Sequence, residues 1–181
     1  MSSDIAVEAR NELKKAGLNS RQVSVRHRPC GYSSKLIFTI RDDKVSERMV
    51  EDIAKRFKCI DYDRRTMEIL EGGNTYVSVV RKWQDENGPA IPDDFKKAWE
   101  TVLENSRTEG KLGEGTEYDG HVIHLDGDGE VHMFLRNTNL PYHRGVRMWR
   151  DGTEVMLHVW RWIYNDRLDL KYLESRKEVA G

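Results

Sequence analysis

The chain has few cysteines: only Cys30 and Cys59 occur among its 181 residues. They do not form a Cys-x-x-Cys pair, which excludes a zinc ribbon and a thioredoxin-like redox motif. Free cysteine is among the most buried residue types, so we expect both thiols to lie in a core. A chain of 181 residues can bury a sizeable core without disulfide bonds or a structural metal.

Long apolar runs are also absent. No stretch of the sequence approaches the ~18 consecutive apolar residues that a membrane-spanning helix needs. The first residues, Met1 to Asp4, contain neither a basic segment nor the apolar stretch of a signal peptide. We therefore expect a cytoplasmic protein that makes no contact with a membrane.

The familiar catalytic motifs are missing too. The sequence has no Gly-x-Ser-x-Gly, no phosphate-binding loop and no dinucleotide fingerprint, and neither cysteine stands beside a histidine in a recognisable motif. We accordingly expect no cofactor and favour a binding protein over an enzyme. An enzyme whose site is scattered over two halves of the chain stays open as a third hypothesis.

Three histidines, His121, His124 and His132, lie close together in the sequence and need testing as a metal site. A two-residue turn between their strands would put His121 and His132 on one face, whereas a three-residue loop would pair His124 with His132. Neither register gathers all three, so a third ligand would have to come from elsewhere, such as His143 or His158. We therefore predict no metal site.

Charge is unevenly distributed along the chain. Residues 1–83 hold 17 Lys and Arg against 12 Asp and Glu, a formal charge of +5, and residues 84–181 hold 13 against 19, a formal charge of −6. Charged residues make up 34% of the chain, but 38% hydrophobic residues and five Trp indicate a folded protein with a well-solvated surface. The asymmetry is compatible with a basic face for an anionic partner or with attraction between the halves.

Hydrophobic periodicity predicts a domain over residues 1–83 that begins with a helix. Ile5, Ala9 and Leu13 recur every four residues, which is typical of a helix, and Val23 and Val25 alternate with polar residues as in a strand. The predicted elements are a helix over 4–16, strands over 22–28 and 34–41, a helix over 46–58, and strands over 66–71 and 75–82. This order makes an αββαββ unit with two hairpins.

A polar stretch that contains Gly-Pro indicates a linker over residues 84–91. The second domain, 92–181, is expected to start with an amphipathic helix near Pro92. Two antiparallel hairpins then follow, 120–126 with 130–136 and 145–150 with 153–163, the second joined by Asp151-Gly152, a type I′ turn signal. A last helix would be capped by Asn165 or Asp166. The predicted fold class is α+β.

The second of these hairpins predicts a surface for a partner. Alternation about the Asp151-Gly152 turn gives one aliphatic face and one mixed face rich in tryptophan. The candidate partner-binding residues on the mixed face are Arg147, Trp149, His158, Trp160 and Trp162. Trp and Arg are enriched at protein interfaces, and flat aromatic rings also stack on unpaired bases. The alternative is that a helix covers this face.

A second candidate surface lies on the first hairpin. The solvent side of these strands is predicted to carry Arg26, Arg28, Lys35 and Arg41, which could contact phosphates. The alternatives are an ordinary charged strand face, diluted by the acidic residues that follow Arg41, or docking against the acidic second half.

Several short stretches of the first half resemble a known family. They are Ala9–Lys15, Val23–Arg26, Gly31–Ser34 leading into a strand, and the helix that ends in Phe57. Together they resemble one of the large polyvalent protein-associated domains, the twenty-ninth of that series, over residues 8–80. The resemblance implies a small α+β domain of phages, prophages and conjugative elements, without catalytic residues to carry over.

This resemblance sets the functional expectation. It implies a non-enzymatic accessory protein of a phage or mobile element, acting in the cytoplasm of a bacterial host cell and binding a host macromolecule. A host protein is the preferred target over nucleic acid, and inhibition of a host defence complex is one form of that role. The alternative is a nucleic-acid-binding accessory protein that uses the basic strand face and the Trp-rich hairpin.

Overall fold

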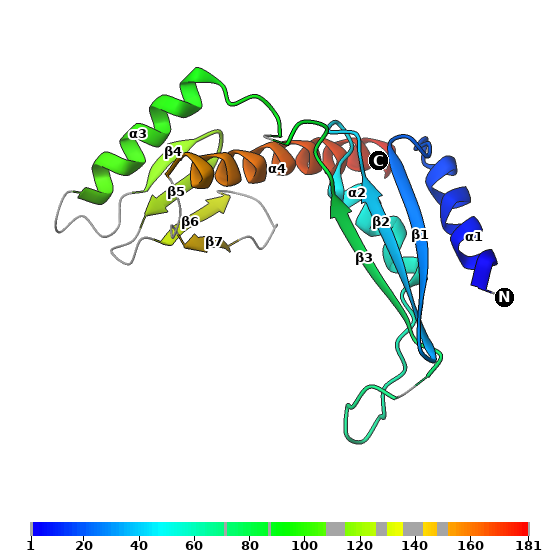
Figure 1. The fold of residues 1–181 in the computed structure, drawn as a ribbon. Coiled ribbons are helices and arrows are strands. Elements are labelled where there is room, and N and C mark those ends of the chain that lie inside the picture. Colours follow the sequence, from blue (N-terminus) through cyan, green and yellow to red (C-terminus); the bar gives the residue numbers. More distant parts are fainter. Residues whose placement is uncertain are drawn as a thin grey trace. The chain divides into compact units, whose positions relative to one another are not determined.

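The computed structural model describes residues 2–70, 72–86, 88–107, 115–125, 130–135, 143–147 and 152–180 (Figure 1). The chain forms two compact units. The first comprises Met1–Glu86 together with Arg167–Gly181, and the second comprises Asn87–Asp166. The first boundary falls within the stretch predicted as a linker, and the last residues of the chain group with the first unit. The unit boundaries therefore differ at this end from the predicted second domain, 92–181.

The first unit is built on a three-stranded sheet of order β1-β2-β3. Strand β1 (Val23–Cys30) pairs antiparallel with β2 (Ser33–Ile40), and β2 pairs in parallel with β3 (Thr75–Arg81). Helix α1 (Ser2–Lys15) precedes β1, and between β2 and β3 come helix α2 (Glu47–Ala54) and a 3₁₀ turn over Lys55–Phe57. Because the helices and the first hairpin follow the predicted order, the α+β class is confirmed.

Helices α1 and α2 both pack on one face of the sheet. Ala9 and Leu13 of α1 and Val50 and Ile53 of α2 join Phe38 of β2 in a single buried cluster. Alternate strand residues point to opposite faces, so the remaining positions of the three strands face the other way. Those positions are half-buried or exposed. The sheet thus presents one packed face and one open face.

The strand predicted over residues 66–71 is not formed in its described part, 66–70, which corrects the second predicted hairpin of this domain. Residues 58–70 instead make an arm in which one isolated bridge joins Tyr62 to Ile69, and a second joins Cys59 to Thr75 of β3 (Figure 1). Polar groups hold the arm: the Asn74 side chain donates to Leu70 O (2.6 Å) and accepts from Asp61 N (2.8 Å). Since β3 pairs with β2 rather than with 66–71, a hydrophobic run beside Gly72-Gly73 did not suffice to make a local hairpin.

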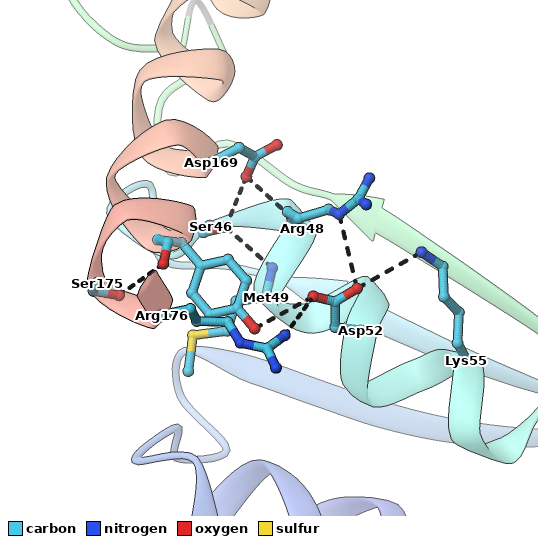
Figure 2. A network of polar contacts seen from close by, with 9 residues as sticks. Ser46, Arg48, Met49, Asp52, Lys55, Asp169, Ser175 and Arg176 are labelled. Carbon is cyan, nitrogen blue, oxygen red and sulfur yellow. Dashed lines mark hydrogen bonds and ion pairs between the residues drawn. The ribbon is translucent and has the colours of Figure 1, made fainter. Parts of the chain in front are cut away.

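The C-terminal part of helix α4 (Gly152–Ala180) caps helix α2 within the same unit (Figure 2). Ser46 is the N-cap of α2, and its hydroxyl accepts from Met49 N at 3.1 Å. The buried Asp169 carboxylate accepts from Ser46 Oγ at 2.7 Å and from Arg48 N at 3.0 Å. A carboxylate at a helix N-terminus satisfies orphan N–H groups and complements the helix dipole.

The second unit combines helix α3 (Asp93–Arg107) with a four-stranded antiparallel sheet and the first part of α4. The strands, in sheet order, are β4 (Thr116–Tyr118), β5 (His121–Leu125), β6 (Glu130–Leu135) and β7 (His143–Arg147). The predicted hairpin of 120–126 with 130–136 is therefore confirmed. The core brings together Phe95 and Trp99 of α3, Ile123 of β5, and Val159 and Trp160 of α4.

The strand predicted over residues 153–163 is wrong, because helix α4 runs unbroken through this segment. Val155, Val159 and Ile163 are all buried, and their i, i+4, i+8 spacing fits a helix as well as the alternation fits a strand. Asp166 lies inside α4 rather than at its cap. Strand β7 pairs with β6 instead of with 153–163, so the predicted Asp151-Gly152 hairpin does not form.

Cys30 and Cys59 are both exposed free thiols, so their predicted burial is wrong: Cys30 ends an edge strand and Cys59 lies at the base of the arm, where it bridges to Thr75. Among the helices that the structure describes, none combines the length and apolar character required to cross a membrane.

Candidate nucleic-acid interface

The open face of the first sheet carries the basic residues predicted from the sequence. Arg28 of β1 lies directly opposite Lys35 of β2, and Lys35 in turn lies beside Tyr76 of β3. The next row on this face is formed by Arg26 and Ile37 with Ser78. Residues that are direct partners in neighbouring strands share a face of the sheet, so both rows point the same way.

The predicted Arg41 extends this surface beyond the end of β2. Lys82 N donates to Ile40 O at 2.8 Å, which continues the β2–β3 ladder and places Lys82 beside Arg41. Both side chains are exposed. An open hollow at this end of the face is lined by Arg26, Thr39, Arg41, Lys82, Trp83 and Gln84. We define the basic face as Arg26, Arg28, Lys35, Arg41 and Lys82.

The cations of the basic face are not neutralised within the fold. None of the five makes an ion pair or a side-chain hydrogen bond with any residue in the described part of the chain. The three strands themselves contain no Asp or Glu. An uncompensated group of like charges on a flat surface produces a positive potential that attracts polyanions.

Cations on the helical side of the same unit behave differently. The Asp52 carboxylate lies 3.7 Å from both Arg48 Nε and Lys55 Nζ and 3.4 Å from Arg176 Nη1 (Figure 2). Tyr172 also donates its hydroxyl to Asp52 at 3.4 Å. Arg48, Lys55 and Arg176 therefore share one acidic partner on the helical side, whereas the cations of the basic face form no ion pair with any described residue.

Glu12 of α1 plays a similar part on the helical side. Its carboxylate lies 2.6 Å from Lys15 Nζ and 3.1 Å from Arg56 Nη1. The Lys15 ammonium, by hydrogen bond and charge, and then the Arg56 guanidinium hold the pKa of Glu12 below its usual value.

The acids that follow Arg41 are tied into the loop before α2. The Asp42 carboxylate accepts from Lys44 N at 3.0 Å and from Gln22 Nε2 at 3.1 Å. These bonds, the Lys44 N–H first, hold the pKa of Asp42 below its usual value. Asp43 Oδ1 accepts from Gln84 N at 3.2 Å. Both carboxylates thus form hydrogen bonds at the end of the sheet, and they follow Arg41 in the sequence rather than lying within the three strands.

One strand cation has a structural role. Arg81, the last residue of β3, donates from Nη2 to Val45 O at 2.6 Å and lies with its guanidinium carbon 4.9 Å from the Trp83 ring centroid. Its side chain is only 5% exposed. Arg81 therefore fastens the β2–α2 loop to β3 and is not part of the basic face.

The predicted Trp-rich surface does not form as a strand face. His158, Trp160 and Trp162 lie on helix α4, where residues two apart point in different directions. Trp160 is 3% exposed, contributes to the core of the second unit and donates its indole N–H to Pro89 O at 3.1 Å. Trp149 and the side chain of Arg147 lie outside the described residues. His158, Trp160 and Trp162 therefore do not share the single strand face that was predicted for a partner.

The three histidines do not share one face of the sheet. Their arrangement is the one predicted for a three-residue loop, in which His124 pairs with His132. His124 pairs with His132 across β5 and β6, with ring centroids 6.4 Å apart. His121 is buried on the other face, with Nε2 3.2 Å from Asp166 Oδ2 and Nδ1 2.8 Å from Asp119 O. Within the ranges that the structure describes, no group of three or more His, Cys, Asp or Glu side chains is arranged to hold a metal ion.

Sequence reasoning missed Lys82 and Tyr76 as members of the open face. The alternation of 75–82 contained that signal, because Tyr76 and Lys82 fall on the polar side of the predicted strand. The expected local hairpin with 66–71 hid their proximity to Lys35 and Arg41, which arises from the parallel pairing of β3 with β2.

The sequence matches no family model, and neither a curated protein nor a solved structure matches the chain.

Proposed function

We propose that this chain is a nucleic-acid-binding protein that holds the phosphate backbone on the open face of its first sheet. The observation that carries the proposal is the set of uncompensated cations on one face of the neighbouring strands β1 and β2, Arg26, Arg28 and Lys35, with Arg41 and Lys82 at one end. Contacts between Lys or Arg and phosphate release counterions and supply most of the affinity of proteins that bind nucleic acid without reading its sequence.

Two triple variants with equal net charge test this proposal. One replaces Arg26, Arg28 and Lys35 with Gln, and the control replaces Lys14, Lys55 and Arg56, three exposed cations on the helical side. We expect the first variant to lose at least about tenfold in affinity for a fluorescein-labelled oligonucleotide, and the control to bind like the wild type. Equal affinity of the two variants in fluorescence anisotropy would show that location on the sheet does not matter and would overturn the proposal.

A second candidate function is binding of a partner protein through the arm, as expected of a mobile-element accessory protein that acts on a host defence complex. Tyr62, Met67, Ile69 and Leu70 expose their apolar side chains there, and Met67 is 71% exposed. Residues 58–70 carry three basic and three acidic residues, so the tip is formally neutral and suits an apolar protein surface better than a polyanion.

The arm is held by polar bonds that do not involve these side chains. Asp63 Oδ1 accepts from Arg65 N at 2.7 Å and from Thr66 N at 3.1 Å. Replacing Met67 and Ile69 with Asp should therefore leave the fold intact. We expect this variant to lose a stoichiometric protein captured from nuclease-treated bacterial lysate while keeping its affinity for oligonucleotides. Undiminished capture by the variant would rule out the arm as the binding surface.

A further inference from the structure

The open face combines cations with an aromatic ring in one row. Arg28, Lys35 and Tyr76 are consecutive partners across β1, β2 and β3. Neighbouring strands lie about 4.8 Å apart, so the row spans about 10 Å. The Tyr76 hydroxyl makes no hydrogen bond with a residue in the described ranges. An aromatic side chain that reaches the surface beside two cations can take a base on its ring while the cations contact the adjoining phosphates.

Apolar side chains continue this surface along the strands. Ile37 is half-buried in the row next to Tyr76, and Val80 of the following row is 48% exposed although it lies in a regular strand. Phosphate contacts need neither residue, whereas the faces of bases and sugars do pack on such side chains. The face therefore offers more apolar contact than a purely phosphate-binding surface requires.

Tyr32 adds a second ring at the end of the sheet nearest the first row. It occupies the two-residue turn between β1 and β2, follows Gly31 at φ +57°, and is 91% exposed. Its backbone is fixed, because Gly73 N donates to Tyr32 O at 2.8 Å. Lys35 is only three residues away, about 10 Å along an extended strand. A fully exposed ring on a fixed turn is available for stacking at little entropic cost.

We infer that the basic face selects single-stranded nucleic acid, with Tyr76 stacking an unpaired base and Tyr32 stacking a further one towards the β1–β2 turn. The inference rests on the proposed function and names its substrate class. In a duplex the base faces are stacked on each other, so only the phosphates would reach this surface. In a single strand the bases can turn onto the rings while Arg28 and Lys35 hold the backbone.

The test compares labelled single strands of dT and of U with a duplex of equal length, all at 150 mM salt, using fluorescence anisotropy. We expect the wild type to bind at least one of the single strands about tenfold or more tightly than the duplex, and the ratio of the dT to the U affinity reports the preferred sugar. Stacking on one ring predicts that Tyr76→Ala weakens single-strand binding about 5-fold to 150-fold. Duplex affinity should stay unchanged, and Tyr76→Phe should bind like the wild type.

The two tyrosine variants distinguish base stacking from the phosphate binding on which the inference rests. Tyr32→Ala cannot disturb the core, because its side chain is exposed, and it should also weaken single-strand binding selectively. Equal affinity for single strand and duplex, or an unaffected single-strand affinity in both tyrosine variants, overturns the inference and leaves phosphate binding intact. Absence of any binding by the wild type overturns both.

Discussion

Arg28 lies directly opposite Lys35 in the β1–β2 ladder of the first sheet. Like charges at directly opposed positions destabilise a sheet, and neither side chain has an ion-pair partner among the described residues. The fold therefore carries a repulsive pair at a site where a neutral residue would be more favourable. Such a pair is expected where the charges serve a ligand that neutralises them.

Replacing Lys35 with Gln should raise stability and lower binding together. Removing the repulsion from Arg28 should increase the free energy of unfolding by about 0.2–1 kcal/mol in urea denaturation. The same change should weaken oligonucleotide binding, because one phosphate contact is lost. Lys14→Gln on the helical side serves as the matched control and should alter neither quantity. A less stable Lys35→Gln protein with wild-type affinity would contradict the assignment of Lys35 to the basic face.

Loss of the buried carboxylate that caps α2 should destabilise the first unit. Asp169→Ala leaves the Ser46 hydroxyl and Arg48 N–H without their acceptor, which we expect to cost about 1–3 kcal/mol. Ser46→Ala should cost about 1 kcal/mol through its lost cap. Because the two residues share one hydrogen bond, the double variant should lose less than the sum. Strict additivity in thermal or urea unfolding would show that the pair does not act as one cap.

Stability should decline in acid partly through Asp42. Its pKa is held below the ordinary value of 3.8 by the Lys44 N–H and the Gln22 side chain, so the folded state binds this proton less readily than the unfolded state. The contribution is therefore complete above about pH 4, begins to fall as the pH drops through the unfolded value, and is gone below the native pKa. Asp42→Asn should be less stable than the wild type at pH 7, and the difference should shrink towards pH 2. A pH-independent difference would contradict the role of the ionised carboxylate.

Trp160 should behave as a core residue rather than a contact residue. Its burial and its bond to Pro89 O predict that Trp160→Ala costs about 3–5 kcal/mol of stability in the second unit. Trp162→Ala should cost less, because Trp162 is only partly buried against the same cluster. Melting temperatures of both variants, followed by circular dichroism, measure the difference. A Trp160→Ala protein with an unchanged melting temperature would place this ring outside the core.

The sequence predicted most of the first unit because its signals are local. Alternation between Val23 and Arg28, the apolar stripe of α2 and the turn at Gly31 each depend on neighbouring residues. The parallel pairing of β3 with β2 could not be predicted from such local signals. It joins segments about 40 residues apart, whereas local alternation favours residues 66–71 as a closer hairpin partner.

In residues 153–163 the spacing of apolar residues is compatible with both a strand and a helix. Val155, Leu157, Val159 and Ile163 satisfy a two-residue alternation, and Val155, Val159 and Ile163 also satisfy a helical spacing. The helix forms because the segment continues without a break to Ala180 and buries its apolar stripe against α3 and β5.

Four basic residues of the candidate site, Arg26, Arg28, Lys35 and Arg41, were predictable from strand alternation. Tyr76 and Lys82 joined them only through the non-local pairing.

The salt dependence of single-strand binding tests the central claim most directly. Each phosphate contact contributes about 0.7 to the slope of log Kd against log salt concentration for single strands. Substitution of Arg26, Arg28 and Lys35 by Gln should therefore reduce the slope by about 2 relative to the wild type, while the control at Lys14, Lys55 and Arg56 should keep the wild-type slope. Equal slopes for all three proteins would contradict phosphate binding on the basic face.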